Sequence, residues 1–266
     1  MRQRQARNFR RCPQLSMSRA ESLPTLPGKR DAIAGAREVY EALCARSDQR
    51  IGGFEFACGT VAAREISGDF VTAFERNGEW YLALGDLMGK GLSAAMWLTH
   101  VLDLVKRSCE TGLCLQGIMS MLNREMHRSR VGVPLVSLFL AKLEPETGRL
   151  TYCCGGCPPG FLLAEGRRLS LLERGGPILG AFEESTYAAA TIDFGLHDTL
   201  LVVSDGILEV HRGTTFELRP DQVTRHLQFT AGDSAGSIVR SLLTRVQNSS
   251  PVLADDLSLL ALKRVD

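Results

Sequence analysis

Apolar residues along this chain follow two spacings. In four segments they recur every three or four residues, as on the buried face of an amphipathic helix, and elsewhere they alternate with polar residues or form short runs, as in β-strands. The predicted helices span residues 31–46, 91–108, 115–128 and 234–246. The predicted strands span residues 54–63, 70–75, 80–84, 135–143, 149–154, 161–164, 169–172, 188–194, 199–203 and 257–263. We therefore expect a mixture of helices and strands.

The order of these elements narrows the fold class. Strands run in succession, a pair of helices interrupts them, more strands follow, and a helix and a strand close the series. Doubly wound parallel sheets need strict alternation of strand and helix, and this order does not have it. Asn77 and Gly78 supply a two-residue hairpin turn between two of the strands. We expect an α+β fold with antiparallel sheets packed in layers.

The composition allows a sizeable core and argues against a membrane or secreted protein. Of the 266 residues, 44% are apolar and 23% are charged, which suits a globular domain. No apolar run approaches the roughly 18 residues that span a bilayer, and no apolar stretch follows the basic start as a secretory signal requires. The eight cysteines are irregularly spaced, as reduced thiols are. We expect a cytoplasmic protein with no membrane contact.

Charge divides the chain into an amino-terminal arm and a body. Residues 1–30 hold eight Lys and Arg against one acid, whereas the remainder holds 23 against 29. Such an arm could touch nucleic acid or anionic lipid, but without a pattern of interleaved aromatic residues a disordered, solvated tail is the simpler interpretation. We divide the chain into this arm, a lead-in helix and linker at 31–50, and one catalytic domain at 51–266. We expect no nucleic-acid partner, and the lead-in helix suggests a homodimer.

Four aspartates share a local setting of small or glycine neighbours. They are Asp69 in Ser-Gly-Asp, Asp86 in Gly-Asp-Leu, Asp205 in Ser-Asp-Gly and Asp255 in Ala-Asp-Asp. Any single one could simply make a turn, as Asp-Gly pairs often do. Brought together, however, such carboxylates would repel unless a hard divalent cation such as Mg²⁺ or Mn²⁺ neutralised them. Zinc is disfavoured, because no His or Cys accompanies these aspartates at ligand spacing.

Six motifs occur in an order that resembles one protein family. They are REISGDF, YLALGDLMGKGLSAAM, LTYCCGGCPPGFLL, GGPILGAF, DTLLVVSDGILEV and ADDLSLLALKR. Over about residues 31–264 the chain is similar to the SpoIIE/RsbU-like branch of the PPM (PP2C-type) metal-dependent serine/threonine phosphatases. The resemblance implies a four-layer αββα sandwich, two antiparallel sheets between helical layers. It also implies two divalent metal ions, Mn²⁺ or Mg²⁺, in a cleft at one end of the sheets.

The resemblance further assigns roles to individual residues. It implies that Asp86 bridges both ions and that the main-chain carbonyl of Leu87 binds one of them. Asp205 and Asp255 would complete the other, and Asp69 would act through water. Two ions activate a water that attacks phosphorus directly. The expected catalytic residues are therefore Asp86, Asp205 and Asp255, with no nucleophile of the Gly-x-Ser-x-Gly or Cys-x5-Arg kind.

Two assignments stay open. Asp256 adjoins Asp255 and could share metal coordination, form hydrogen bonds, or exchange roles with it. Arg64 lies five residues before Asp69, where relatives keep a phosphate-binding arginine. A salt-bridged surface arginine fits this position equally well.

The chain departs from the family pattern at two places. Thr72 stands where an acid usually follows the first motif, which weakens the case for a third ion but not for the central pair. Cys154 and Cys157 form a Cys-x-x-Cys where the family usually reads Asn-Ala-Gly-His. A redox switch or half a zinc site are functional interpretations, and thiols in a turn are the plain one.

The resemblance implies that the chain hydrolyses phosphoserine or phosphothreonine on a phosphorylated regulatory protein. In this family that partner is often a STAS-type anti-sigma-factor antagonist. We expect a separate sensor or regulator protein to supply the input, since only about 30 residues precede the lead-in helix. The alternatives are a catalytically silent binding module that sequesters a signalling partner, and a hydrolase of small phosphoesters.

Overall fold

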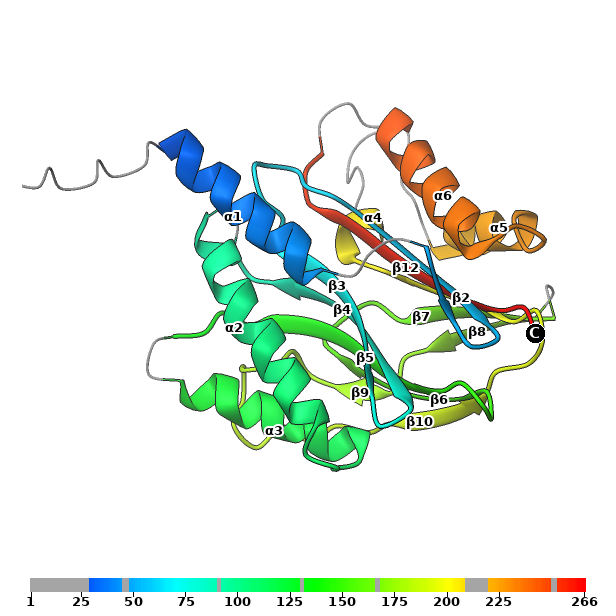
Figure 1. Ribbon diagram of the computed structural model, residues 1–266, viewed down its shortest axis with the longest axis horizontal. Helices are drawn as coiled ribbons and strands as arrows, with labels where there is room; N and C mark the ends of the chain where they lie inside the picture. Colours follow the sequence, from blue (N-terminus) through cyan, green and yellow to red (C-terminus); the bar gives the residue numbers. More distant parts are fainter. Residues whose placement is uncertain are drawn as a thin grey trace, which may run out of the picture.

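The computed structural model describes residues 29–44, 48–89, 92–129, 132–165, 168–208, 220–249 and 253–266 (Figure 1). Residues 1–28 of the predicted basic arm lie outside the described residues. Its last two residues belong to helix α1 (Lys29–Leu43), which begins two residues earlier than the pattern indicated. Asp31 therefore lies in the first turn of α1, where its negative charge interacts favourably with the positive end of the helix dipole.

Within the described residues the strands form two sheets. The first contains, in spatial order, β1 (Gln49–Ile51), β2 (Phe54–Val61), β12 (Leu257–Arg264), β11 (Thr199–Val203), β7 (Gly160–Ala164) and β8 (Arg168–Leu172). The second contains β10 (Ala190–Asp193), β6 (Arg149–Gly155), β5 (Val136–Glu144), β4 (Glu79–Leu87) and β3 (Asp69–Arg76), with β9 (Gly175–Gly176) beside β6. Neighbouring strands are antiparallel except for β6 and β9.

Helices cover the outer faces of both sheets (Figure 1). Helices α2 (Leu92–Cys109) and α3 (Leu115–Arg128) share an apolar core with the second sheet. Helices α5 (Pro220–Phe229) and α6 (Ala235–Ser249) share another with the first. A third core, which includes Phe56, Leu84 and Leu260, fills the space between the sheets. This arrangement confirms the predicted αββα sandwich.

The two-sided burial explains the continuous apolar runs in the central strands. All five residues of β11 are buried, because one face packs on the opposite sheet and the other on α5 and α6. Strands covered on both faces lose the alternation of apolar and polar residues. Among the described residues, no helix is long and apolar enough to cross a membrane, and all the cysteines are free thiols.

The β3–β4 hairpin confirms the predicted Asn77-Gly78 turn. Both residues have positive φ angles, 54° and 82°, which is the conformation that matches the twist of a two-residue hairpin. The turn sets a register in which Asp69, at the start of β3, lies opposite Asp86, near the end of β4.

Candidate functional site

Strand ends bring the predicted aspartates to one end of the sandwich. Asp205 lies two residues after the end of β11, at the start of the short helix α4 (Asp205–Leu208), and Asp255 and Asp256 directly precede β12, the antiparallel neighbour of β11. Asp69 and Asp86 lie together on the other sheet. Residues from four distant parts of the chain thus gather into what we call the acidic cluster: Asp69, Asp86, Asp205, Asp255 and Asp256.

The hydrogen-bond alternation of the β3–β4 ladder places the first two carboxylates side by side. The amide of Leu87 donates to the carbonyl oxygen of Gly68 at 3.2 Å. The next pair, Asp69 and Asp86, is consequently a non-hydrogen-bonded pair, in which side chains on the same face approach most closely.

Burial and mutual repulsion shift the titration of the cluster. Burial, followed by the charges of Asp205, Asp255 and Asp256, raises the pKa of Asp86 to about 7. Burial and the neighbouring charge of Asp86 hold the pKa of Asp69 well above its ordinary range. These shifts indicate that the carboxylates are close enough to disfavour simultaneous ionisation.

Asp69 is only partly satisfied by its surroundings. It is 2% exposed, and its Oδ2 atom is buried with no hydrogen-bond partner among the residues that the structure describes. The hydroxyl groups of Ser258 and Ser204 partly offset the rise in its pKa. Neither serine was singled out from the sequence, where Ser204 is simply the residue before Asp205. A buried carboxylate oxygen without a donor favours a cation nearby.

Because Gly68 has no side chain, oxygen atoms of three neighbouring residues lie close to its main chain. A Cβ atom at this position would lie 2.9 Å from the Gly89 carbonyl oxygen, 3.1 Å from that of Leu87 and 3.4 Å from Asp86 Oδ1. The Leu87 carbonyl and the Asp86 carboxylate, predicted as ligands of one ion, therefore face the same small space. Carbonyl and carboxylate oxygens are the donors that Mg²⁺ and Mn²⁺ prefer.

Gly206 allows the two halves of the site on the first sheet to meet. A Cβ atom there would lie 2.0 Å from the Asp256 carbonyl oxygen and 3.4 Å from Asp255 Cβ. The Asp205-Gly206 pair is thus more than a turn, because its glycine permits the close approach of the Asp255-Asp256 segment.

The adjacent acids Asp255 and Asp256 have different surroundings. Asp256 is buried, and its carboxylate accepts hydrogen bonds from the amides of Ala63 at 2.7 Å and Gly68 at 2.6 Å. Asp255 is half-buried, and its Oδ1 accepts a hydrogen bond from the Asp256 amide at 2.9 Å. Asp256 therefore anchors the loop that precedes Asp69.

Arg64 lies in that same loop with an exposed side chain. In the parts of the chain that the structure describes it forms neither an ion pair nor a hydrogen bond. Both assignments of Arg64, as a phosphate-binding arginine and as a salt-bridged surface arginine, stay predictions. The structure does not bring the guanidinium into contact with the acidic cluster either.

The donor set of the cluster fits hard divalent cations. Its candidate ligand atoms are carboxylate and carbonyl oxygens. Among the described residues, Asp69 Oδ2 receives no hydrogen bond. Across the described ranges, however, no three Asp, Glu, His or Cys side chains are gathered closely enough to hold a metal ion as they stand. Binding would therefore require side-chain adjustment within the cluster.

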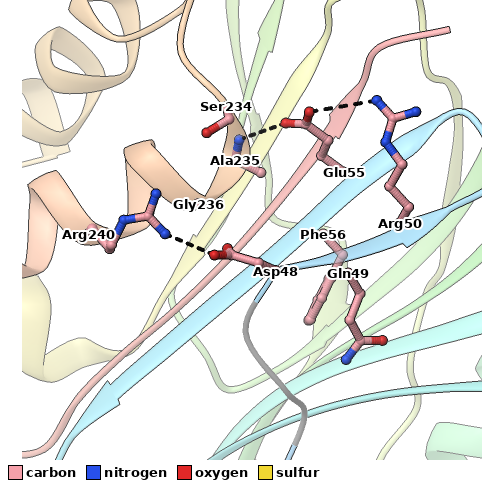
Figure 2. Close-up of a pocket in the computed structure, with 9 residues that line it drawn as sticks. All are labelled: Asp48, Gln49, Arg50, Glu55, Phe56, Ser234, Ala235, Gly236 and Arg240. Carbon is pink, nitrogen blue, oxygen red and sulfur yellow. Dashed lines mark hydrogen bonds and ion pairs between the residues drawn. The ribbon is translucent and has the colours of Figure 1, made fainter.

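A cavity of about 230 Å³ lies at the opposite end of β2 and is less suited to this chemistry (Figure 2). Its acids already have partners: Asp48 pairs with Arg240 at 2.9 Å, and Glu55 accepts the Ala235 amide at 3.1 Å. Figure 2 shows Glu55, near the start of β2, reaching the first residue of α6, and Asp48, just before β1, reaching Arg240 further along the same helix. The cavity thus marks an anchor between strand and helix.

This cavity also contains a serine in a Gly-x-Ser-x-Gly run, Gly232 to Gly236, contrary to our expectation that the sequence lacks one. Ser234 Oγ accepts a hydrogen bond from the Ser237 amide at 3.2 Å, as the N-cap of a helix does. No histidine is among the described residues that line the cavity. The run therefore starts helix α6, with Ser234 as its N-cap.

The Cys-x-x-Cys pair lies where β6 ends. Cys154 is buried, and its thiol donates to the Leu172 carbonyl oxygen at 3.3 Å. A hydrogen bond with Cys157, and then burial, raise the pKa of Cys154. A protonated thiol is a poor nucleophile and a poor metal ligand, which agrees with the plain interpretation of thiols in a turn.

A family model and a known relative each match more than two thirds of this chain. The family model described as Stage II sporulation protein E (SpoIIE) matches residues 76–265. Phosphoserine phosphatase RsbU of Bacillus subtilis is 26% identical over 209 residues, which cover 77% of this chain and 62% of RsbU. The chain therefore spans less than two thirds of that relative.

Two solved structures share the fold. The SiaA-PP2C domain of Pseudomonas aeruginosa has a TM-score of 0.76 at 14% identity, covering 89% of this chain and 97% of that domain. The catalytic domain of the serine/threonine phosphatase PstP in complex with two manganese ions has a TM-score of 0.59 at 14% identity, covering 80% and 99%. The family match over most of the chain and the shared PP2C fold establish that this protein belongs to the SpoIIE family of PP2C-type phosphatase domains.

Proposed function

We propose that this protein is a metal-dependent serine/threonine phosphatase that hydrolyses phosphoserine or phosphothreonine on a regulatory protein. The observation that carries the proposal is the crowding of carboxylates around Asp86, whose pKa rises to about 7 through burial and the charges of Asp205, Asp255 and Asp256. Such a cluster is most stable in its ionised form when cations occupy it. RsbU, which is named a phosphoserine phosphatase, supports the assignment.

The residues fit two divalent ions, Mn²⁺ or Mg²⁺. Asp86 would contact both ions, and the Leu87 carbonyl would bind one. Asp205 and Asp255 would complete the other, and Asp69 would act through water. Asp255 is preferred to Asp256 as a ligand, because both carboxylate oxygens of Asp256 already accept main-chain hydrogen bonds. The two manganese ions in the PstP complex support the number of ions.

Bound ions of this kind supply an acidified water and neutralise charge on a phosphoryl group. The protein contributes a rigid arrangement of ligands: β3 and β4 fix Asp69 opposite Asp86, and Gly206 keeps Asp205 beside Asp255. The exposed Arg64 is available to bind a phosphate oxygen in the loop before Asp69. We expect Asp86, Asp205 and Asp255 to be the catalytic set and expect no covalent phosphoenzyme.

The substrate we propose is a phosphorylated regulatory protein of the STAS type, an antagonist of an anti-sigma factor, with activation by a separate sensor or regulator. The basis is membership in the SpoIIE family together with the similarity to RsbU.

Phosphate release tests the proposal. We expect the full chain to release phosphate from a phosphoserine protein when Mn²⁺ is present, to stop when EDTA removes the metal, and to lose at least about 100-fold in rate in Asp86→Asn. Asp193→Asn is a suitable control, because this acid is exposed on the edge strand β10. Its rate should match the wild type.

Three other results would contradict the proposal. Equal rates for wild type and Asp86→Asn would show that the acidic cluster takes no part in the reaction. No release at any metal concentration, combined with tight binding of the phosphoprotein, would favour the silent binding module. Hydrolysis of p-nitrophenyl phosphate that is as efficient as that of the phosphoprotein would favour a hydrolase of small phosphoesters.

A further inference from the structure

A tyrosine of helix α1 contacts the strand that carries Asp69. The Tyr40 hydroxyl donates a hydrogen bond to the main-chain carbonyl oxygen of Asp69 at 2.9 Å, across 29 positions of sequence. Figure 1 shows α1 lying close to β3 and beside α2.

The register of the hairpin explains why this carbonyl needs a donor. Strand β3 is at the edge of its sheet, so its outer main-chain groups have no ladder partner. The Gly68 carbonyl points inward to the Leu87 amide, and alternation turns the Asp69 carbonyl outward. Tyr40 satisfies the main-chain group that a second strand would otherwise satisfy.

The surroundings of Tyr40 keep its hydroxyl a donor. A phenol with the ordinary pKa of about 10 keeps its proton at physiological pH, and burial raises the pKa of Tyr40 further. The ring borders a cavity of about 280 Å³ between α1, β2 and β3, which Cys44, Cys58 and Val71 also line. Because packing on that side is incomplete, the hydrogen bond takes a larger share in fixing α1 against β3.

A second connection of α1 to this region, made by Arg37, holds the chain at Glu65, four residues before Asp69. The Arg37 guanidinium donates to the Glu65 carbonyl oxygen at 2.8 Å, and both side chains are exposed. Arg37 therefore holds the loop before Asp69, whereas Tyr40 holds the residue that bears the carboxylate. This difference separates general attachment of the helix from local positioning.

We propose that Tyr40 is a positioning residue for the acidic cluster: its hydroxyl fixes the main chain at Asp69 and thereby the direction of the Asp69 carboxylate beside Asp86. The positioning exists in the metal-free protein. Its consequence for metal binding rests on the proposed function.

Tyr40→Phe in the full chain tests the inference, because it removes the hydroxyl and keeps the ring. Tyr81→Phe is the matched control, since the Tyr81 hydroxyl on β4 contacts Glu79 at 3.5 Å. Arg37→Ala controls for loosening of the helix. Two quantities are measured: hydrogen exchange of residues 66–71 in the metal-free protein, and Mn²⁺ affinity from the electron paramagnetic resonance signal of the free ion.

We expect Tyr40→Phe to speed exchange at residues 66–71 and to weaken Mn²⁺ binding by about threefold to tenfold, the range that a single hydrogen bond supports. Both controls should stay within about twofold of the wild type. Unchanged exchange in Tyr40→Phe, or an equal effect of Arg37→Ala, would overturn the inference. A wild-type protein that binds no Mn²⁺ would instead refute the proposed function, and the exchange measurement would still decide the role of Tyr40.

Discussion

Asp69 and Asp86 face each other across the β3–β4 ladder at a non-hydrogen-bonded position. Side chains at such a position come close together, and both of these are carboxylates in a largely buried setting. The pKa of Asp86 rises to about 7, and that of Asp69 lies well above its ordinary range. The Asp69 and Asp86 carboxylates therefore repel each other when both are ionised, and a bound cation would reduce this repulsion.

The first prediction concerns the pH dependence of the metal-free protein. Folding raises the pKa of both carboxyls above the unfolded value of about 3.9, so the folded state binds more protons between that value and about pH 7. The free energy of unfolding contributed by the pair should therefore fall as pH rises through this window. Asp86→Asn should flatten the slope and stabilise the metal-free protein near neutral pH by roughly 1 kcal/mol or more.

Urea unfolding in EDTA across this pH window measures the effect. Addition of Mn²⁺ should reverse the order of stability, because the wild type then gains binding energy that the variant lacks. Identical slopes for the two proteins without metal would contradict the prediction.

A second prediction concerns Gly206. Its replacement by alanine would place a methyl group 2.0 Å from the Asp256 carbonyl oxygen, a clash that the main chain must move to relieve. We expect Gly206→Ala to destabilise the fold by roughly 2 kcal/mol or more and to weaken Mn²⁺ binding. Gly232→Ala is the control, because nothing lies within 4 Å of a Cβ atom there. Equal thermal midpoints for both variants would show that the close approach is unimportant.

The third prediction separates the neighbouring acids. Asp256→Asn should cost about 1–3 kcal/mol of stability, because the amide group cannot accept both the Ala63 and the Gly68 hydrogen bonds. Asp255→Asn keeps an oxygen for the Asp256 amide, so its stability should stay within about 0.5 kcal/mol of the wild type. Its Mn²⁺ affinity, measured by calorimetry, should fall. A loss of stability in Asp255→Asn and a loss of Mn²⁺ affinity in Asp256→Asn would instead assign loop anchoring to Asp255 and metal binding to Asp256.

Much of this architecture could be predicted from local patterns. The hairpin turn at Asn77-Gly78 is visible because its two residues tolerate positive φ. Strands β11 and β12 stand out because burial on both faces makes them rich in apolar residues, with four in a row in β11 and in the middle of β12. The three-residue edge strand β1 and the helix α5 were missed, since a strand so short has no period and α5 buries only Val223, His226 and Leu227.

The acidic cluster could be predicted only in part. The glycine and serine neighbours of the aspartates indicate tight loops, and the family resemblance indicates their convergence. The different surroundings of Asp255 and Asp256 depend on hydrogen bonds to Ala63 and Gly68, which are far away in sequence. The contact of Tyr40 with Asp69 likewise depends on how α1 docks. Local sequence carries no signal for such long-range pairs.

A fourth prediction concerns His226 in α5. Burial lowers its pKa, with a smaller contribution from Arg245, and its ring contacts the Ser241 hydroxyl at 3.1 Å. Because the unfolded chain binds the proton more readily, the contribution of His226 to the free energy of unfolding should fall as pH drops below about 6.5. His226→Gln should flatten this part of the stability profile.

The exposed His100 provides the comparison for that measurement. His100→Gln should leave the dependence of the urea midpoint on pH as it is in the wild type. Parallel profiles for wild type and His226→Gln below about pH 6.5 would contradict the assignment.

Crystals of the full chain grown with Mn²⁺ test the central claim most directly. Anomalous diffraction at the manganese absorption edge locates the ions independently of any model of the ligands. We predict peaks bounded by Asp86, the Leu87 carbonyl, Asp205 and Asp255, with Asp256 still hydrogen-bonded to the loop before Asp69. An anomalous map without a peak between Asp86 and Asp205, at a metal concentration that supports phosphate release, would contradict the account.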